Sequence, residues 1–333
     1  RIGDVTQTVV TQTVVTGSGG ELARRLRQDG VPTREVTWRA GLDPRALLGI
    51  LAELRSGPAL LHAHDGHSLT LAGAAAWRSG SPLVVTRRVN FHLRRPGFWA
   101  RADRVIAISE AVAAVLRADG IAPDRIAVVH SGIDVTDAER AVPLGIRARL
   151  GLPPDALVAA SVGALEPPKD HATLLRAAAL LESRCPSLYW VIAGGGPLRP
   201  KLERLLDELR LRRRVHFLGQ MADALPLVAD ADMFVMSSKE EGLGTSVLDA
   251  MARGIPVAST AAGGLPEMLG GGVGLLVPPE RPEALADAMA RLADDPELRR
   301  ELQTRGRAAV HRFSAKRMAG EVRRVYRSCS PFT

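Results

Sequence analysis

The stretch EEGLGTSVLDAMARGIPV, residues 240–257, follows the apolar run MFVM and joins two glycines to an apolar helix pattern. This order predicts a buried strand that ends in a glycine turn, after which a helix begins. Amides in the first turn of a helix lack partners within the helix, so such a turn can bind anionic or hydroxyl-rich groups. Glu241 and Asp249 lie near the turn. In an isolated helix these acids would only favour the positive end of the dipole.

The turn GLGTSV shares its first two glycines with the fingerprint of dinucleotide-binding proteins. Val247 stands where that fingerprint has its third glycine, and no acid follows the next strand, which ends at Ser259. A ribose would therefore lack its usual carboxylate. We expect neither a nicotinamide nor a flavin site.

Short apolar runs alternate with helical patterns along most of the chain, as in βαβ units. The pattern restarts after Gly132, so residues 131–152 are expected to join two domains. The predicted fold class is α/β, with two doubly wound, Rossmann-like domains. The predicted strands are PALLHA, PLVVT, RVIAIS and RIAVVH in the first part, and LVAASV, LYWVIAG, VHFLG, MFVM, PVAS and GLLVP in the second.

Composition limits the class of protein. A chain of 333 residues, 46% of them hydrophobic, can build about two domain cores. No apolar run approaches the length of a membrane-spanning helix, and the two cysteines lie far apart, so we expect a soluble, cytoplasmic protein. The net charge of +8 favours an anionic partner, although a GC-rich genome also enriches arginine.

Several segments occur together in a fixed order. They are HSGID (residues 130–134), VGALEPPKDHATLLRAA from Val162, VIAGGGPLRPKLE from Val191, VHFLGQ from Val215, and EGLGTSVLDAMARGIPVAST with AGGLPEML and GGVGLLVPP. Together they resemble the retaining glycosyltransferase family 4 enzymes of GT-B fold, the glycosyl transferases group 1. The similarity extends from about residue 58 to Tyr326. It implies two Rossmann-like domains that face a cleft.

The resemblance also implies domain boundaries. Residues 1–132 would form the N-terminal acceptor-binding domain, and residues 133–313 the C-terminal domain that binds the nucleotide-sugar donor. Residues 314–333 would form a helix that packs back toward the N-terminal domain.

The resemblance assigns roles around the glycine turn. Glu241 would contact hydroxyls of the donor sugar, Lys169 would support the diphosphate, and Asp249 occupies the place of a glutamate that holds the ribose. An ammonium group suits phosphate oxygens because it is a compact positive charge. The implied donor-binding residues are Gly163, Lys169, Glu241, Gly242, Leu243, Gly244, Thr245 and Asp249.

The chain departs from the family pattern at three places. Ala164 stands where many relatives have an arginine beside the diphosphate, and Asp249 is one methylene shorter than the usual glutamate. Arg87 and Arg88 stand about where many relatives have a histidine near the reaction centre. A guanidinium cannot act as a general base, but it can stabilise a leaving phosphate, so Arg87 could replace the charge missing at Ala164.

The segment HAHDGH, residues 62–67, allows more than one interpretation. His62, His64, Asp65 and His67 could be imagined as zinc ligands, but no second ligand cluster accompanies them, so we expect no metal. Histidines satisfied within the structure are the alternative to a functional role. By the resemblance, we expect one of His62, His64 or His67 to position acceptor or donor. The acceptor-side candidates are His62, His67 and Arg88, and the catalytic candidates are Glu241, Lys169, Arg87 and His64.

Residues 87–104 read RRVNFHLRRPGFWARADR and interleave arginines with Phe91, Phe98 and Trp99. Such a mixture suits the headgroup layer of an anionic membrane, where rings sink and arginines meet phosphates. A solvated basic face is the alternative. No nucleic-acid-binding module is recognised, so no nucleic acid is expected as a partner.

The front of the chain, VTQTVVTQTVVTGSGG, has two interpretations. Either GSGG is the glycine-rich loop with which family members begin, or the first strand, loop and helix are absent. The first domain is short for the family, so we favour the second interpretation. An exposed strand edge would then invite pairing with another chain, and thus a homodimer.

These observations predict a retaining glycosyltransferase of hexosyltransferase type. It would move a sugar from a nucleotide-diphosphate sugar to an envelope glycan or lipid-linked acceptor, without a metal or a cofactor other than this co-substrate. It would act in the cytoplasm, with a possible place at the inner face of the plasma membrane. The alternative is a GT-B protein that binds nucleotide sugar or a partner with little or no transferase activity.

Overall fold

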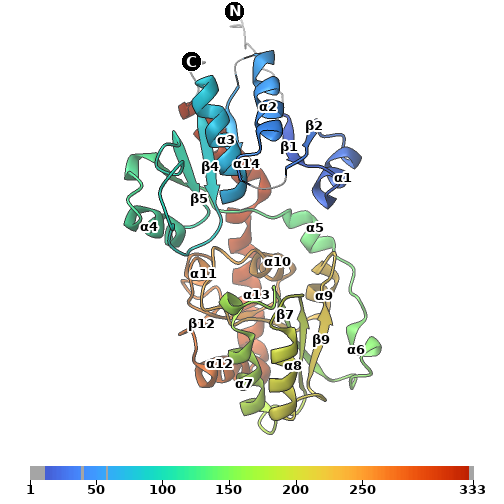
Figure 1. Ribbon diagram of the computed structural model, residues 1–333. Coiled ribbons are helices and arrows are strands. Elements are labelled where there is room, and N and C mark those ends of the chain that lie inside the picture. Colours follow the sequence, from blue (N-terminus) through green and yellow to red (C-terminus); the bar gives the residue numbers. More distant parts are fainter. Residues whose placement is uncertain (1–11, 39–40, 58, 330–333) are drawn as a thin grey trace, which may run out of the picture. The chain divides into compact units, whose positions relative to one another are not determined.

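The computed structural model of the chain describes residues 12–38, 41–57 and 59–329. It divides into two compact units, each of which is built from separate stretches of the chain (Figure 1). Unit 1 comprises the chain up to Thr86, Gly97–Val105, and the end from Tyr326. Unit 2 comprises Arg87–Pro96 and Ile106–Val325. The domain boundaries implied by the resemblance stay a prediction.

Unit 2 is built on a six-stranded sheet in the order β12-β11-β10-β7-β8-β9, and its described strand pairs are parallel. The strands are short and apolar because helices cover both faces of a parallel sheet. The expected strands of this part are all present. They are β7 (Leu157–Val162), β8 (Leu188–Ala193), β9 (Val215–Gly219), β10 (Met233–Met236), β11 (Val257–Thr260) and β12 (Leu275–Val277).

The core of unit 2 lies between this sheet and its helices. Trp190, Leu174 and Met289 come from β8, α7 and α12, and all three are buried in one hydrophobic cluster. Three 3-10 turns are η2 (Pro123–Arg125), η3 (Pro167–Lys169) and η4 (His311–Phe313). The helices are α4 (Glu110–Ala118), α5 (Val135–Arg140), α6 (Ile146–Arg149), α7 (His171–Leu181), α8 (Arg199–Glu208), α9 (Leu225–Asp230), α10 (Thr245–Arg253), α11 (Leu265–Leu269), α12 (Pro282–Asp294), α13 (Pro296–Val310) and α14 (Ala315–Cys329).

The first half of the chain forms two smaller sheets, of which one has the order β1-β2 and the other the order β3-β4-β5-β6. The four strands expected from apolar runs are present in the second sheet. The strands are β1 (Val14–Gly17), β2 (Thr33–Val36), β3 (Leu61–Ala63), β4 (Leu83–Arg87), β5 (Arg104–Ala107) and β6 (Ile126–Val128). The helical elements are α1 (Glu21–Gln28), α2 (Pro44–Glu53), η1 (Leu54–Ser56) and α3 (Gly66–Ser79).

The front of the chain forms a small βαβ unit. A strand, the glycine loop GSGG, a helix and a parallel strand follow one another as β1, α1 and β2. Which of the family's units they represent stays a prediction. The first copy of the TQTVV repeat lies outside the described residues. In the described part of the chain β1 pairs with β2 alone, and Val15 is 37% exposed. A homodimer through this edge stays a prediction.

Two of the three aromatics in residues 87–104 have packing roles. Trp99 is buried, and the ring of Phe98 lies against Gly73 of α3 so closely that a Cβ atom there would be 2.4 Å from it. These rings therefore help to stabilise unit 1, and the buried Trp99 is not available to a membrane surface. Phe91 is 55% exposed, so a membrane contact of this segment would depend on Phe91 and the arginines. None of the helices in the described ranges is long and apolar enough to cross a bilayer.

Gly73→Ala should destabilise unit 1 by about 1–3 kcal/mol, because the added methyl group displaces the Phe98 ring from its packing against α3. The matched control is Gly66→Ala in the same helix, where a Cβ atom meets nothing within 4 Å. Urea denaturation followed by tryptophan fluorescence measures both variants. Equal midpoints for the two would contradict this account of the packing.

Candidate functional site

The glycine turn follows β10 at the carboxyl end of the sheet of unit 2, the edge at which such folds bind ligands. Gly244 is the N-cap of α10 and has φ of 95°, a left-handed conformation that favours glycine. Among the described residues, no protein acceptor bonds the amides of Leu243, Gly244, Thr245 and Ser246. The turn thus offers several free donors and the positive end of a helix dipole.

Lys169 and Glu241 meet at this turn although 72 residues separate them. The Lys169 ammonium lies 2.5 Å from a carboxylate oxygen of Glu241, and Ser238 donates a hydrogen bond of 3.3 Å to the same oxygen. The side chain of Glu241 is 9% exposed and that of Lys169 is 26% exposed. The Lys169 stem runs along Gly163, within van der Waals distance of where a Cβ atom would lie. Three of the residues implied by the resemblance are therefore neighbours.

Backbone contacts hold the two loops together beneath this ion pair. The Ser237 hydroxyl donates to the carbonyl of Lys169 at 3.0 Å. The amides of Lys239 and Glu240 both donate to the carbonyl of Pro168, at 2.9 and 3.2 Å. The position of Lys169 relative to Glu241 is thus set by the main chain and not by the ion pair alone.

His171, which begins α7 two residues after Lys169, was not singled out from the sequence. It is 3% exposed, and burial, together with the charge of Lys169, lowers its pKa to about 4. The imidazole is therefore neutral at pH 7 and adds no positive charge beside Lys169. The sequence does not indicate that this histidine is neutral, because its burial is determined by the fold.

Asp249 lies on α10, eight residues after Glu241. Burial, and secondly the negative charge of Asp223, raise the pKa of its carboxyl group to about 6. A carboxyl group with this pKa changes protonation near neutral pH, and it gains from hydroxyl groups that donate to its ionised form. This environment suits the ribose role that the resemblance implies, which stays a prediction.

The back of the turn carries residues that sequence reasoning missed. Glu267 of α11 accepts hydrogen bonds from the amides of Glu110 and Ala111, at 2.9 and 3.0 Å, and pairs with His130 at 2.8 Å. Burial alone would raise the pKa of the Glu267 carboxyl group, but these three hydrogen bonds outweigh it and lower the pKa. The signal available in the sequence was the acid that follows the glycine pair of AGGLPEML.

The histidines of residues 62–67 belong to unit 1, whereas Glu241 and Lys169 belong to unit 2. His62 uses both ring nitrogens, toward the hydroxyls of Tyr326 at 2.6 Å and Thr86 at 2.7 Å, which is typical of a structural histidine. Its ring also stacks on His64, with 4.1 Å between centroids. His64 and His67 are exposed, and the acceptor role of these histidines stays a prediction.

Asp65 has a structural role, because its carboxylate accepts a hydrogen bond of 2.7 Å from the amide of Ser68 and caps α3. In the part of the chain that the structure describes, no group of three His, Cys, Asp or Glu side chains is placed to hold a metal ion.

Arg87 and Arg88 differ in their surroundings. The Arg87 guanidinium is buried, donates to the carbonyl of Phe91 at 2.5 Å and lies over the Phe91 ring. Burial lowers its pKa, while the charge of Asp119 acts in the opposite direction. Arg88 is exposed, and its carbonyl abuts Gly242. Compensation of Ala164 by Arg87 remains a prediction, and it would require the Arg87 guanidinium to leave Phe91.

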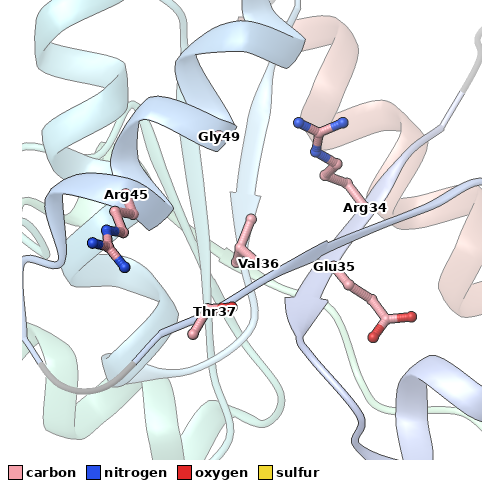
Figure 2. A pocket seen from close by; sticks show the side chains of 6 residues that line it. All are labelled: Arg34, Glu35, Val36, Thr37, Arg45 and Gly49. Atoms are coloured by element: carbon pink, nitrogen blue, oxygen red, sulfur yellow. The ribbon is translucent and has the colours of Figure 1, made fainter.

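A pocket of about 350 Å³ lies between β2 and α2 in unit 1 (Figure 2). Figure 2 shows Arg34 and Arg45 on opposite sides of it, with Glu35 pointing away from Arg45. Glu35 is paired with Arg27 at 2.8 Å. The charged groups of this pocket do not converge on one ligand, so the glycine turn is the better candidate site.

Asp249→Asn should stabilise the protein at pH 8 by on the order of 2 kcal/mol, and the gain should vanish near pH 4. The pKa of the folded state, about 6, lies above that of an unfolded aspartate. Ionisation of Asp249 therefore costs stability above pH 6 and costs nothing below pH 4. Urea denaturation across this range measures the effect, with the exposed Asp287→Asn as control. A gain that does not change with pH would contradict the burial of Asp249.

Two family models match the chain. The model described as Glycosyl transferases group 1 matches residues 145–309, and the one described as Glycosyltransferase Family 4 matches residues 7–137. The first match contains Gly163, Lys169, Glu241 and Asp249.

Curated relatives of the chain are also named as glycosyltransferases. The D-inositol 3-phosphate glycosyltransferase of Saccharomonospora viridis is 34% identical over 293 residues, which is 84% of this chain and 67% of the relative. The lipopolysaccharide core biosynthesis glycosyltransferase LpsE of Rhizobium meliloti is 38% identical over 162 residues, 48% of this chain and 46% of LpsE. The chain spans about two thirds of the length of several of the D-inositol 3-phosphate glycosyltransferases that it matches.

Solved structures show the fold. The structure of Anabaena Alr3699/HepE in complex with UDP and glucose matches with a TM-score of 0.85 at 22% identity, over 95% of this chain and 91% of that one. The predicted fold class, two Rossmann-like domains of GT-B type, is confirmed by this likeness and by the parallel sheets. The chain belongs to the glycosyltransferases that the Glycosyl transferases group 1 and Glycosyltransferase Family 4 models describe.

Proposed function

We propose that this glycosyltransferase moves a sugar from a nucleotide-diphosphate sugar to a hydroxyl group of its acceptor with retention of anomeric configuration. The observation that carries the proposal is the ion pair of Lys169 and Glu241 beside a glycine turn whose amides are free. A donor of this class has two anionic phosphates next to a polyhydroxylated ring. It thus needs a cation, several N–H donors and a carboxylate at one place.

Lys169 is proposed to bind the diphosphate. To do so its ammonium exchanges the Glu241 carboxylate for a phosphate oxygen, and hydrogen bonds from Ser238 and the sugar hydroxyls then have to compensate the buried carboxylate. A charge-assisted hydrogen bond of this kind contributes about 1.5–3 kcal/mol. The free amides at Leu243 to Ser246 and the dipole of α10 add further stabilisation of negative charge.

Glu241 is proposed to accept hydrogen bonds from hydroxyls of the donor sugar once Lys169 has turned to the phosphates. Asp249 is proposed to hold the ribose. Its pKa of about 6 means that a fraction of the carboxyl groups is protonated near neutral pH, so ribose binding should strengthen as pH rises toward 8.

The proposed reaction proceeds on one face of the sugar. The bond from the anomeric carbon to the diphosphate oxygen breaks, the bond to the acceptor oxygen forms on the same face, and the acceptor proton passes to the leaving diphosphate. No carboxylate nucleophile is needed, in contrast to retaining glycosidases. Lys169 and the amides of the turn stabilise the charge that develops on the leaving group. We propose that no divalent ion is required, and that EDTA leaves turnover unchanged.

The acceptor is proposed to be an envelope glycan or a lipid-linked sugar, with the protein in the cytoplasm at the inner face of the membrane. The likeness to LpsE, a lipopolysaccharide core biosynthesis glycosyltransferase, supports this choice. Phe91 and the arginines of residues 87–104 would supply a membrane contact. D-inositol 3-phosphate, named in the function of several relatives, is the competing acceptor and is assayed beside it.

A second candidate is a protein that binds nucleotide sugar and transfers it slowly or not at all. Ala164 favours this candidate, because one positive charge that many relatives place beside the diphosphate is missing. The engagement of Arg87 with Phe91 has the same consequence, since the guanidinium would have to leave the Phe91 carbonyl to reach a phosphate.

The first experiment is thermal stability of the purified protein with a panel of nucleoside diphosphates and nucleotide sugars. A ligand that binds the folded state raises its stability by mass action. One base should raise the melting temperature, and Lys169→Ala should abolish the increase. Glu241→Ala should weaken the increase with the nucleotide sugar and preserve that with the diphosphate. Lys201→Ala, on α8, is the matched control.

No change with any nucleotide at millimolar concentration would contradict the proposed donor site. An increase in melting temperature without release of nucleoside diphosphate, whichever acceptor is added, would favour the binding protein over the transferase.

A further inference from the structure

Ser109 connects the start of α4 to the glycine turn within unit 2. Its hydroxyl donates a hydrogen bond of 2.7 Å to the carbonyl of Gly242 and accepts one of 3.1 Å from the amide of Val112. The side chain is fully buried. A buried carbonyl must find a donor, and Ser109 supplies it 133 residues away from Gly242 in the chain.

Close packing on the other sides leaves the turn little freedom. A Cβ atom on Gly242 would lie 2.2 Å from the carbonyl oxygen of Arg88. One on Gly264 would lie 2.6 Å from the carbonyl oxygen of Gly242 and 3.0 Å from the Cβ of Ser109. Gly263, with φ of 52°, lies against the carbonyl of Glu241, where a Cβ atom would be 1.6 Å away. The backbone of two segments, at Arg88 and at Gly263–Gly264, together with the side chain of Ser109, therefore surrounds residues 241–243.

Glu267 holds the start of α4, the segment that carries Ser109. It follows Gly264 by three residues and holds the first amides of α4, those of Glu110 and Ala111, which adjoin Ser109. The segment that packs against the turn is thereby also the segment that anchors Ser109. A shift of α4 would move the donor of the Gly242 carbonyl, and the loop that carries Glu241 would follow.

We propose that Ser109 is a positioning residue for the donor sugar, and that Glu267 supports it by holding the start of α4. The inference rests on the proposed function and deepens it. Ser109 acts through the main chain of Gly242 on Glu241, the group proposed to bind sugar hydroxyls. It does not act on Lys169, whose loop is held separately by Ser237 and Pro168.

Because the two loops are held separately, loss of the Ser109 hydroxyl should affect the binding of the sugar more than the binding of the diphosphate. In Ser109→Ala the Gly242 carbonyl loses its donor, and the turn relaxes while Lys169 keeps its place. Affinity for UDP-glucose should fall about tenfold, as expected for one buried hydrogen bond whose loss leaves an unsatisfied group. Affinity for UDP should change less than about twofold, which lies within the few tenths of a kcal/mol expected when no contact is lost.

The experiment is calorimetric titration of the full chain with UDP and with UDP-glucose. Ser259→Ala is the matched control, because Ser259 is also fully buried and also donates to a backbone carbonyl, that of Thr260. Glu267→Gln is the second variant and should shift the ratio of the two affinities in the same direction, by less. Equal losses for UDP and UDP-glucose, or the same ratio in Ser109→Ala as in Ser259→Ala, would overturn the inference.

Hydrogen exchange without ligand separates this inference from the proposed function. The peptide of residues 240–250 should exchange faster in Ser109→Ala than in the wild type or in Ser259→Ala. If the wild type binds neither UDP nor UDP-glucose, these nucleotides are not its donor pair. Hydrogen exchange then decides by itself whether Ser109 positions the turn. Equal exchange of residues 240–250 in Ser109→Ala and in the wild type would refute the inference.

Discussion

The ion pair between Lys169 and Glu241 is the interaction on which the rest of the site depends. Burying a carboxylate to 9% exposure is costly unless a cation and hydrogen bonds compensate it. The compensation comes from a loop distant in sequence, which is possible because β7 and β10 are neighbours in the sheet. The loops after these two strands leave the same edge side by side. A donor with two phosphates and a hydroxyl-rich ring would present to each partner a group of the kind it needs.

The family and most strands could be predicted from the sequence, because apolar runs of strand length between helical patterns are typical of a parallel sheet covered by helices. The bounds of β7, Leu157–Val162, coincide with the run LVAASV. Roles for Lys169 and Glu241 could be assigned by resemblance to the motifs of relatives, and they stay predictions. The contact between these two side chains could not be predicted, since it depends on the order of the strands, which no single segment encodes.

Packing adds what composition alone could not indicate. Phe98 and Trp99 stand among arginines and suggest a membrane surface, yet one packs on a glycine and the other is buried. His62 is an acceptor-side candidate by its motif, and in the structure hydroxyl groups occupy both of its ring nitrogens. Ser109 went unnoticed for the opposite reason, because a serine before a helix is explained by capping and its second bond reaches another loop.

The most direct test of the central claim is a crystal structure of the protein with UDP-glucose bound. The account predicts that the Lys169 ammonium contacts a diphosphate oxygen and that Glu241 accepts a hydrogen bond from a glucose hydroxyl, with the amides of the turn directed at the phosphates. The contradicting result is an intact ion pair of Lys169 and Glu241 with UDP-glucose bound elsewhere, for example between Arg34 and Arg45.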